Sequence, residues 1–424
     1  MVIKEITMKS LKLTDSQIYQ LIQKESQRQA ETLMLIPSEN YTSKAVQEAV
    51  GSVLSNKYAE GYPGRRYYQG QEFVDQVETL AVERAKKLFQ VAYVNVQPHS
   101  GSPANAAVYF GLLEPGDKIM GLTLSHGGHL THGHPKITFS GKFYRSIQYQ
   151  VETNGIINYD KLAKFAKKHK PKLIIAGTTA YPRILEFNKF AKIADSIGAY
   201  LMTDIAHIAG LVLAGSHPYP ARYAHVITTT THKTLRGPRG AMIMVTKRGL
   251  RKDKNLTKKI DKAIIPGMQG GPHLHSIAGI AVALKEASTT RFKRYAQQIV
   301  SNAQVLAKTL QQNGLELTTG GTDNHLMVAD LRSLNILGKD AAILLEKAGI
   351  IVNYNTVPFD PNPPFNPSGI RLGTPAVTSR GMGKSAMKQI GNLIAQVLKK
   401  EKITAKAKKE VKLLCQKFPV AERY

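Results

Sequence analysis

Short apolar runs alternate with helix-like segments through the middle of the chain, and this alternation restricts the fold more than any other feature. Strands that are buried on both faces form short continuous apolar runs, and the helices that connect them cover the two faces of the sheet. The pattern therefore predicts an α/β fold with a mainly parallel sheet. The predicted strands are residues 93–96, 172–176, 199–202, 225–229 and 241–245, and the predicted helices include 159–168 and 188–197.

The segments on either side of this region predict two further parts. The spacing of a capping box at residues 14–17, followed by apolar residues at helical intervals, predicts a first helix in an N-terminal arm. Apolar positions from Glu72 to Phe89 trace one face of a long helix, and amphipathic stretches at 292–312 and 341–348 predict a smaller domain. The proline-rich passage 358–367 is predicted to be a loop. We expect an arm at residues 1–30, a large domain at 31–285 and a small α/β domain at 286–424.

The chain is strongly basic, with a formal charge of +28 at pH 7 and a pI near 9.9. Such a charge is typical of proteins that bind nucleic acid or membrane surfaces. The basic clusters at 247–262 and 399–424 are not interleaved with aromatic residues, as a base-stacking surface would be. We therefore expect solvated helix faces, and no nucleic acid as the main partner. A basic RNA-binding protein that has kept an enzyme fold is the rival hypothesis from another functional class.

Cysteine use and hydropathy indicate where such a protein works. Cys415 is the only cysteine, which excludes an intrachain disulfide and a cysteine-based metal cage, and fits a reducing compartment. No charged-then-apolar signal pattern opens the sequence, and no apolar stretch reaches the ~18 residues that a membrane span needs. We expect a cytoplasmic protein without a membrane segment.

Two strand ends carry residues with complementary chemistry. The run 199–202 leads to Asp204, and the run 225–229 leads to Lys233. In parallel sheets, ligands bind at the carboxyl ends of the strands, where both side chains are predicted to lie. A lysine amine can form a Schiff base with pyridoxal phosphate, and a carboxylate can keep its pyridine nitrogen protonated. The pair therefore predicts this cofactor.

Two loops add groups that suit the same cofactor. Residues 99–105 form a small-residue turn after a predicted strand, and a helix that begins there would offer N–H groups and hydroxyls to a phosphate. An ordinary serine-capped helix is the alternative for this motif taken alone. Residues 125–134 contain four histidines, but glycine-rich flanks and the absence of a nearby carboxylate argue against a metal. We expect no metal site, and we expect His129 to lie flat on an aromatic cofactor.

Two further motifs suit the binding of an amino acid. Residues 58–68 hold four tyrosines and Glu60 in a turn-rich segment that can present acid, base and stacking groups. Arg371 lies in a short predicted strand between glycines and could hold a substrate carboxylate through two hydrogen bonds. A surface ion pair is the alternative for this arginine.

Taken together, these motifs resemble the serine hydroxymethyltransferase family over nearly the whole chain. The resemblance rests on residues 35–41, 58–68, 99–105, 204–207, 230–233, 235–240, 267–272 and 320–325. It implies the aspartate-aminotransferase-like fold of type I, and a homodimer as the smallest active unit, with assembly to a tetramer left open. It also implies pyridoxal phosphate as cofactor and tetrahydrofolate as co-substrate in the conversion of L-serine to glycine and 5,10-methylenetetrahydrofolate.

The resemblance further implies a role for individual residues. Lys233 would hold the cofactor, Asp204 would pair with its ring nitrogen and His129 would stack on the ring. Glu60 would transfer protons, and with Tyr58 and Tyr68 it would come from the partner chain. The phosphate would be held by Ser100, Gly101 and Ser102, together with the partner's Gly270 and Gly271; Thr179, His207, His232 and Arg239 would surround the cofactor; Ser38 and Arg371 would orient the substrate, and Asn355 would contact the folate.

Departures from the family pattern leave part of this open. Pro103 replaces a common glutamine, Ile265 a frequent aromatic residue, and Tyr354 a lysine that is often near the folate. The last change puts the affinity for the folate tail in question. A folate-independent aldolase for β-hydroxy amino acids such as threonine would need the same lysine, aspartate and arginine. Serine turnover that does not rise with tetrahydrofolate would favour that alternative.

Overall fold

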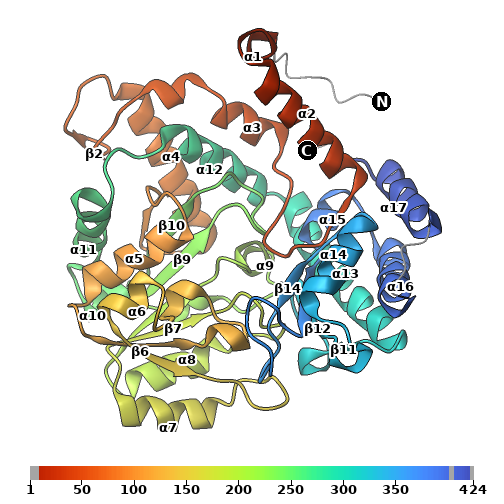
Figure 1. Ribbon diagram of the computed structural model, residues 1–424. Coiled ribbons are helices and arrows are strands. Elements are labelled where there is room, and N and C mark those ends of the chain that lie inside the picture. Colours follow the sequence, from red (N-terminus) through yellow and green to blue (C-terminus); the bar gives the residue numbers. More distant parts are fainter. Residues whose placement is uncertain (1–8, 401–404, 421–424) are drawn as a thin grey trace.

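The computed structural model describes residues 9–400 and 405–420, except the side chain of Lys400, and its centre is a seven-stranded sheet (Figure 1). Five neighbouring strands run parallel, and β10 pairs antiparallel with β4 on one side and β9 on the other. The mainly parallel sheet predicted from the apolar runs is confirmed. In spatial order the strands are β4 (Tyr93–Asn95), β10 (Ala241–Val245), β9 (Val226–Thr230), β8 (Tyr200–Asp204), β7 (Leu173–Gly177), β5 (Lys118–Leu122) and β6 (Arg145–Tyr149).

Helices cover both faces of this sheet, because successive residues of each strand point to opposite sides. Ile174 and Leu201 belong to one apolar core, whereas their neighbours Ile175 and Met202 belong to another. Side chains of α4, α7, α8 and α12 fill the first core, and those of α5 and α11 fill the second. These helices are α4 (Glu72–Phe89), α5 (Gly101–Leu112), α7 (Tyr159–His169), α8 (Phe187–Asp195), α11 (Leu256–Lys262) and α12 (Leu274–Ala287).

A second, antiparallel sheet of four strands lies on one side of the molecule with the C-terminal helices, drawn in blue in Figure 1. Its apolar core is separate from the two cores above. The strands are β11 (Glu316–Leu317), β12 (Leu326–Asp330), β15 (Gly369–Gly373) and β14 (Asn353–Asn355), in that order. The helices of this region are α13 (Thr290–Gln312), α14 (Gly338–Lys347), α15 (Pro375–Ser379), α16 (Lys384–Lys400) and α17 (Ala405–Lys417).

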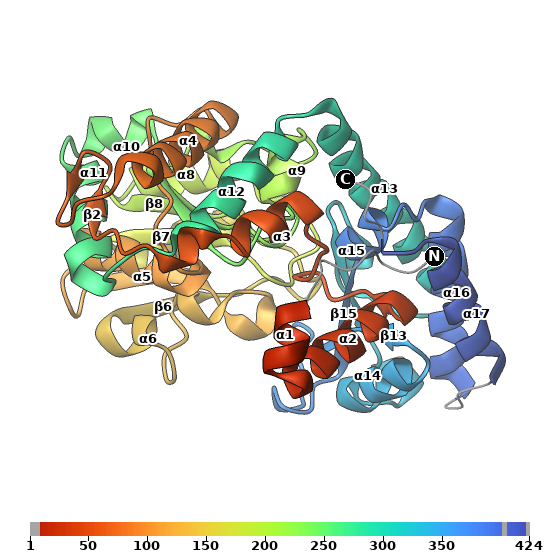
Figure 2. The same ribbon diagram turned by 90° about the horizontal axis from the view of Figure 1, so that it is seen from above.

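The N-terminal segment returns to this C-terminal region. Strand β1 (Leu33–Met34) pairs parallel with β13 (Ile350–Ile351), and helix α2 (Ser16–Glu31) lies against α17, as the view in Figure 2 shows from above. Asp15 caps α2 by accepting the N–H of Ile18, and a further helix, α1 (Lys9–Thr14), precedes it. The capping box predicted at residues 14–17 was therefore wrong by one position, because Thr14 ends the preceding helix.

Helix α13 joins the two halves. Phe292 and Ile299 pack in the core beneath the large sheet, whereas Leu306 and Leu310 pack in the core of the small sheet. The predicted division at 30/31 and 285/286 stays a prediction. Of the predicted arm, residues 1–8 lie outside the described residues, as do 401–404 and 421–424 of the C-terminal basic cluster. Within the described ranges, no helix is both long and apolar enough to cross a membrane. The remaining helices are α3 (Lys44–Val50), α6 (Phe139–Phe143), α9 (Ala209–Leu213) and α10 (Lys247–Lys252).

Candidate active site

Three adjacent strands of the large sheet end at the predicted site. Strand β8 ends at Asp204, which lies between Gly177 of β7 and Thr228 of β9 in the register of the sheet. Strand β9 ends at Thr230, three residues before Lys233. Because these strands are parallel, their carboxyl ends lie at the same edge. The structure thus brings the two residues predicted from separate apolar runs to one place.

Asp204 is held by three hydrogen-bond donors. Its Oδ2 accepts hydrogen bonds from Asn105 Nδ2 at 2.8 Å and from His132 Nε2 at 2.9 Å, and its Oδ1 accepts one from the N–H of Ala206 at 3.0 Å. Burial raises the pKa of Asp204, but His132 and Asn105 outweigh this effect and hold the pKa well below its usual range. The side chain retains 11% exposure, so a charged carboxylate can meet a ligand there.

Lys233 follows β9 in a turn, and its amine is poised for nucleophilic chemistry. Its Nζ donates a hydrogen bond to Thr230 Oγ1 at 2.9 Å. Burial lowers the pKa of Lys233 to about 8, with Arg239 and Arg371 acting in the same direction and Asp204 opposing them. The fraction of the amine that is neutral, and hence nucleophilic, near physiological pH is therefore much larger than in an ordinary lysine.

The N-terminus of α5 lies beside this lysine turn. Ser100 is the N-cap residue but makes no side-chain capping hydrogen bond, so its hydroxyl is not used to close the helix. A Cβ at Gly101 would lie 2.7 Å from Thr230 Cγ2, and only glycine fits without movement. Pro103 is the third residue of the helix, where a missing N–H does little harm. The N–H groups of the first turn have no partner within the helix, and Ser102 lies in this turn; free N–H groups of this kind are what a helix N-terminus offers to an anion.

Two histidines and one arginine lie close enough to Lys233 to interact with its charge. Arg371 on β15 donates to the carbonyl of Thr179 at 2.7 Å and to Asn353 Oδ1 at 3.0 Å. Burial lowers the pKa of Arg371 to about 10, which leaves the guanidinium charged at neutral pH. His207 Nδ1 lies 3.2 Å from His325 Nε2. Burial is the main cause that lowers the pKa of both histidines, to about 3 for His325, so the pair is neutral.

His129 lies near the pair of Asp204 and Lys233. Its Nδ1 is 2.7 Å from Thr131 Oγ1, and burial followed by the charge of His132 lowers its pKa to about 4. A neutral imidazole suits stacking on a ring better than a charged one would. His232 is also neutral, because burial lowers its pKa to about 3.

The tyrosine and glutamate motif forms a second cluster. Tyr68 donates to Glu60 Oε2 at 2.7 Å, and Tyr58 donates to Glu60 Oε1 at 3.4 Å. A Cβ at Gly270 would lie 3.2 Å from Glu60 Oε1, and one at Gly271 the same distance from the ring of Tyr58. Tyr58 is 58% exposed. Among the described residues, no hydrogen bond or ion pair joins this cluster to Lys233 or Asp204. A single chain therefore holds the predicted site residues as two separate groups.

The remaining predicted residues lie around these groups. Ser38, His232 and Arg239 line a cavity of ≈ 260 Å³ whose other wall is formed by Glu25 and Arg28 of α2. Asn355 ends β14, and its side chain donates to the carbonyl of Thr356. The structure does not link Asn355 to Lys233 or Asp204 by a hydrogen bond.

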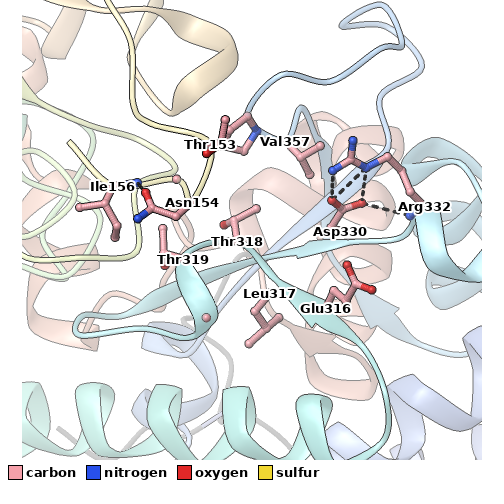
Figure 3. A pocket seen from close by; sticks show the side chains of 13 residues that line it. Thr153, Asn154, Ile156, Glu316, Leu317, Thr318, Thr319, Asp330, Arg332 and Val357 are labelled. Carbon is pink, nitrogen blue, oxygen red and sulfur yellow. Dashed lines mark hydrogen bonds and ion pairs between the residues drawn. The ribbon is translucent and has the colours of Figure 1, made fainter. Parts of the chain in front are cut away.

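A different cavity, of ≈ 510 Å³, lies between the segment 153–156 and strands β11 and β12 (Figure 3). Arg332 folds over Asp330 there and donates to both of its carboxylate oxygens, from Nε to Oδ1 and from Nη2 to Oδ2. None of the site residues predicted from the sequence lines this cavity. It is therefore separate from the site at the strand ends.

Four residues at the site were not predicted. Asn105 and His132 form hydrogen bonds with Asp204. Thr230 accepts a hydrogen bond from the amine of Lys233, and His325 contacts His207. All four lie in segments that the sequence had singled out, although none was predicted as a site residue. These segments are 99–105 for Asn105, 125–134 for His132, 230–233 for Thr230 and 320–325 for His325. Nothing in the spacing could select His132 from the four histidines.

Comparison with known proteins gives a consistent result. A family model described as serine hydroxymethyltransferase matches residues 11–394. A serine hydroxymethyltransferase of Desulfotalea psychrophila is 54% identical over 415 residues, which are 97% of this chain and 96% of the relative. One of Acidothermus cellulolyticus is 57% identical over 389 residues, which are 92% and 89% of the two chains. The resemblance found in the sequence motifs is confirmed, and the chain belongs to the serine hydroxymethyltransferase family.

Proposed function

We propose that this transferase holds pyridoxal phosphate on Lys233 and uses it to interconvert serine and glycine, with tetrahydrofolate as the one-carbon carrier. Membership of the family supports the reaction, and the family uses both compounds. The observation that carries the residue assignment is the lysine of lowered pKa at the same sheet edge as a charged, largely buried Asp204. No observation favours the folate-independent aldolase.

The residues at the strand ends fit this cofactor. Gly101 leaves room beside Thr230 that a Cβ would fill, and the free N–H groups at the start of α5 would bind the phosphate of the cofactor. Asp204 would hold the pyridine nitrogen protonated, because its own pKa lies far below that of a pyridine. His129 would cover the ring, and Thr179 and His207 would contact its 3-oxygen side. When bound, pyridoxal phosphate supplies an electron sink for the bond that breaks next to the substrate amine.

Other side chains would bind and orient the substrates. Arg371 would hold the carboxylate of the amino acid, since its charge persists at neutral pH despite burial. Ser38 would support this contact, and Asn355 would contact the folate. His232 and Arg239 line the cavity beside α2, and from there they would cover the turn that carries Lys233.

The second cluster would act in a neighbouring copy of the chain. Glu60 lies between the hydroxyls of Tyr58 and Tyr68, a setting that suits proton transfer at the substrate hydroxyl. Because this cluster and Gly270 and Gly271 lie together but apart from Lys233, we propose a homodimer in which each chain supplies them to its partner's site. A cytoplasmic location stays a prediction.

The test is a spectrum and an assay of the purified protein. We expect a visible absorbance band that Lys233→Ala removes, and serine turnover that rises when tetrahydrofolate is added. A band and activity that survive in K233A would refute the assignment of Lys233. Turnover that is indifferent to tetrahydrofolate would refute the one-carbon carrier.

A further inference from the structure

We propose that Arg66 is a positioning residue that holds Glu60 in place, and that its effect is felt in the partner's site. This inference rests on the proposed function, because it takes Glu60 as the proton-transfer group supplied to the neighbouring copy. Nothing in the motif itself predicted a role for this arginine, which was one basic residue of a turn-rich segment.

The guanidinium of Arg66 contacts both residues that flank Glu60. Its Nη1 donates to the carbonyls of Ala59 and Gly61, each at 2.9 Å. Its Nε donates to Asp75 Oδ1 at 2.9 Å and its Nη2 to Glu78 Oε2 at 2.7 Å. The side chain is only 3% exposed, so these four hydrogen bonds are shielded from water.

The local backbone gives Glu60 little other freedom. Strands β2 (Gly61–Tyr62) and β3 (Arg65–Arg66) form a small hairpin after it, and the carbonyl of Glu60 accepts the N–H of Tyr67 at 3.1 Å. Gly61 has a φ of +93°, and a Cβ there would lie 2.3 Å from the carbonyl oxygen of Arg65. The hairpin is thus closed tightly, and Arg66 sets its position on the rest of the chain.

Helix α4 is the anchor for this arrangement. Glu78, in the middle of α4, is 2% exposed and also accepts a hydrogen bond from Gln97 Nε2 at 2.8 Å. The same Nε2 donates to the carbonyl of Gly61 at 2.9 Å. A buried carboxylate that loses its partner is strongly destabilising, so Glu78 keeps Arg66 in one geometry. Arg66 therefore transmits the rigid position of α4 to Glu60.

Lysine cannot replace this arginine, because a single ammonium does not reach two carbonyls and two carboxylates at once. We expect Arg66→Lys to lower kcat by roughly 10- to 100-fold through misplacement of Glu60, with little change in KM for serine. Hydrogen exchange at the amide of Tyr67 should become faster, since that amide bonds to Glu60. Arg65→Lys is the matched control, because Arg65 is the exposed neighbour on the same strand, and both readouts should be unchanged.

Hybrid dimers decide in which site Arg66 acts. When R66K and K233A are on different chains, the one intact Lys233 receives Glu60 from a chain with Arg66, and activity should be about half of wild type, one site of two. When both substitutions are on one chain paired with a wild-type chain, the intact Lys233 receives the disturbed hairpin, and activity should stay low. Glu60→Gln in the same two pairings reports on the proposed function alone.

The outcomes separate the two proposals. If E60Q shows this pattern and R66K does not, or if R66K shows the reverse pattern, the inference on Arg66 is wrong and the shared site stands. If E60Q does not show the pattern, the shared site is wrong, and the proposed effect of Arg66 in the partner's site falls with it. Should R66K fail to fold, Asp75→Ala removes one anchor on a side chain that is 24% exposed, and must give a smaller loss with the same pattern.

Discussion

The contact between Gly101 and Thr230 allows a quantitative test of the proposed phosphate cradle. In Gly101→Ala the new methyl would lie 2.7 Å from Thr230 Cγ2, whereas carbon atoms in contact are separated by about 3.5–4.0 Å. One of the two segments must therefore move by about 1 Å, and such overpacking destabilises by about 1–3 kcal/mol. We expect G101A to bind pyridoxal phosphate roughly 5- to 150-fold more weakly, as measured by titration of the cofactor-free protein.

A double variant tests the same contact by also removing the methyl group of Thr230. Thr230→Ser deletes Cγ2 but keeps the hydroxyl that accepts the amine of Lys233, so G101A/T230S should regain most of the affinity. Gly383→Ala is the control for the added methyl, because a Cβ there meets nothing within 4 Å. Affinity in G101A equal to wild type, or a double variant no better than G101A, would show that the close approach does not shape the cradle.

Three further results are expected. Asp204→Asn should keep the cofactor but lower kcat by at least about 10²-fold, because an amide cannot hold a pyridinium proton in place; turnover near wild type in a steady-state assay would contradict this role. The rate at which cofactor-free protein takes up pyridoxal phosphate should rise with pH, with a midpoint near pH 8 and a plateau about one to two pH units higher, because the neutral amine of Lys233 reacts and its pKa is lowered to about 8; a midpoint near 10.5 in stopped-flow absorbance would contradict the lowered pKa. Arg371→Lys should raise KM for serine by about 10- to 100-fold with a smaller effect on kcat, and an unchanged KM would exclude Arg371 as the carboxylate ligand.

The sequence predicted the central strands well but missed two of the seven. Strands β7 and β10 are almost continuously apolar, and β8 and β9 begin with apolar residues; the interiors of all four are buried, which is why they stood out. Strand β6 is an edge strand with partly exposed residues, so its sequence lacks such a run. Strand β5 contains Gly121, where a Cβ would lie 2.3 Å from the carbonyl oxygen of His132. Tertiary contacts of this kind leave no periodic signal.

The site was predictable where it depends on strand ends and less so where it depends on distant partners. Asp204 and Lys233 could be placed because each follows an apolar run. The donors that keep Asp204 charged are 72 and 99 residues away in the chain, and only folding brings them near. The contacts by which Arg66 holds the residues beside Glu60 could not be predicted either. Arg66 and Glu78 belong to a hairpin and a helix whose contact the sequence does not reveal.

Helix α13 limits how far the two halves of the enzyme can move relative to each other. Its 23 residues make a rod of about 35 Å that is embedded at one end in each hydrophobic core. Near the crossing point, Asn302 donates to Thr378 Oγ1 and to the carbonyl of Met382, both at 2.8 Å, which locks the rod against the smaller half. A wide hinge opening would have to pull one end of α13 out of its hydrophobic core. We therefore expect substrate to be admitted by small sliding movements between the two halves and not by a wide hinge movement.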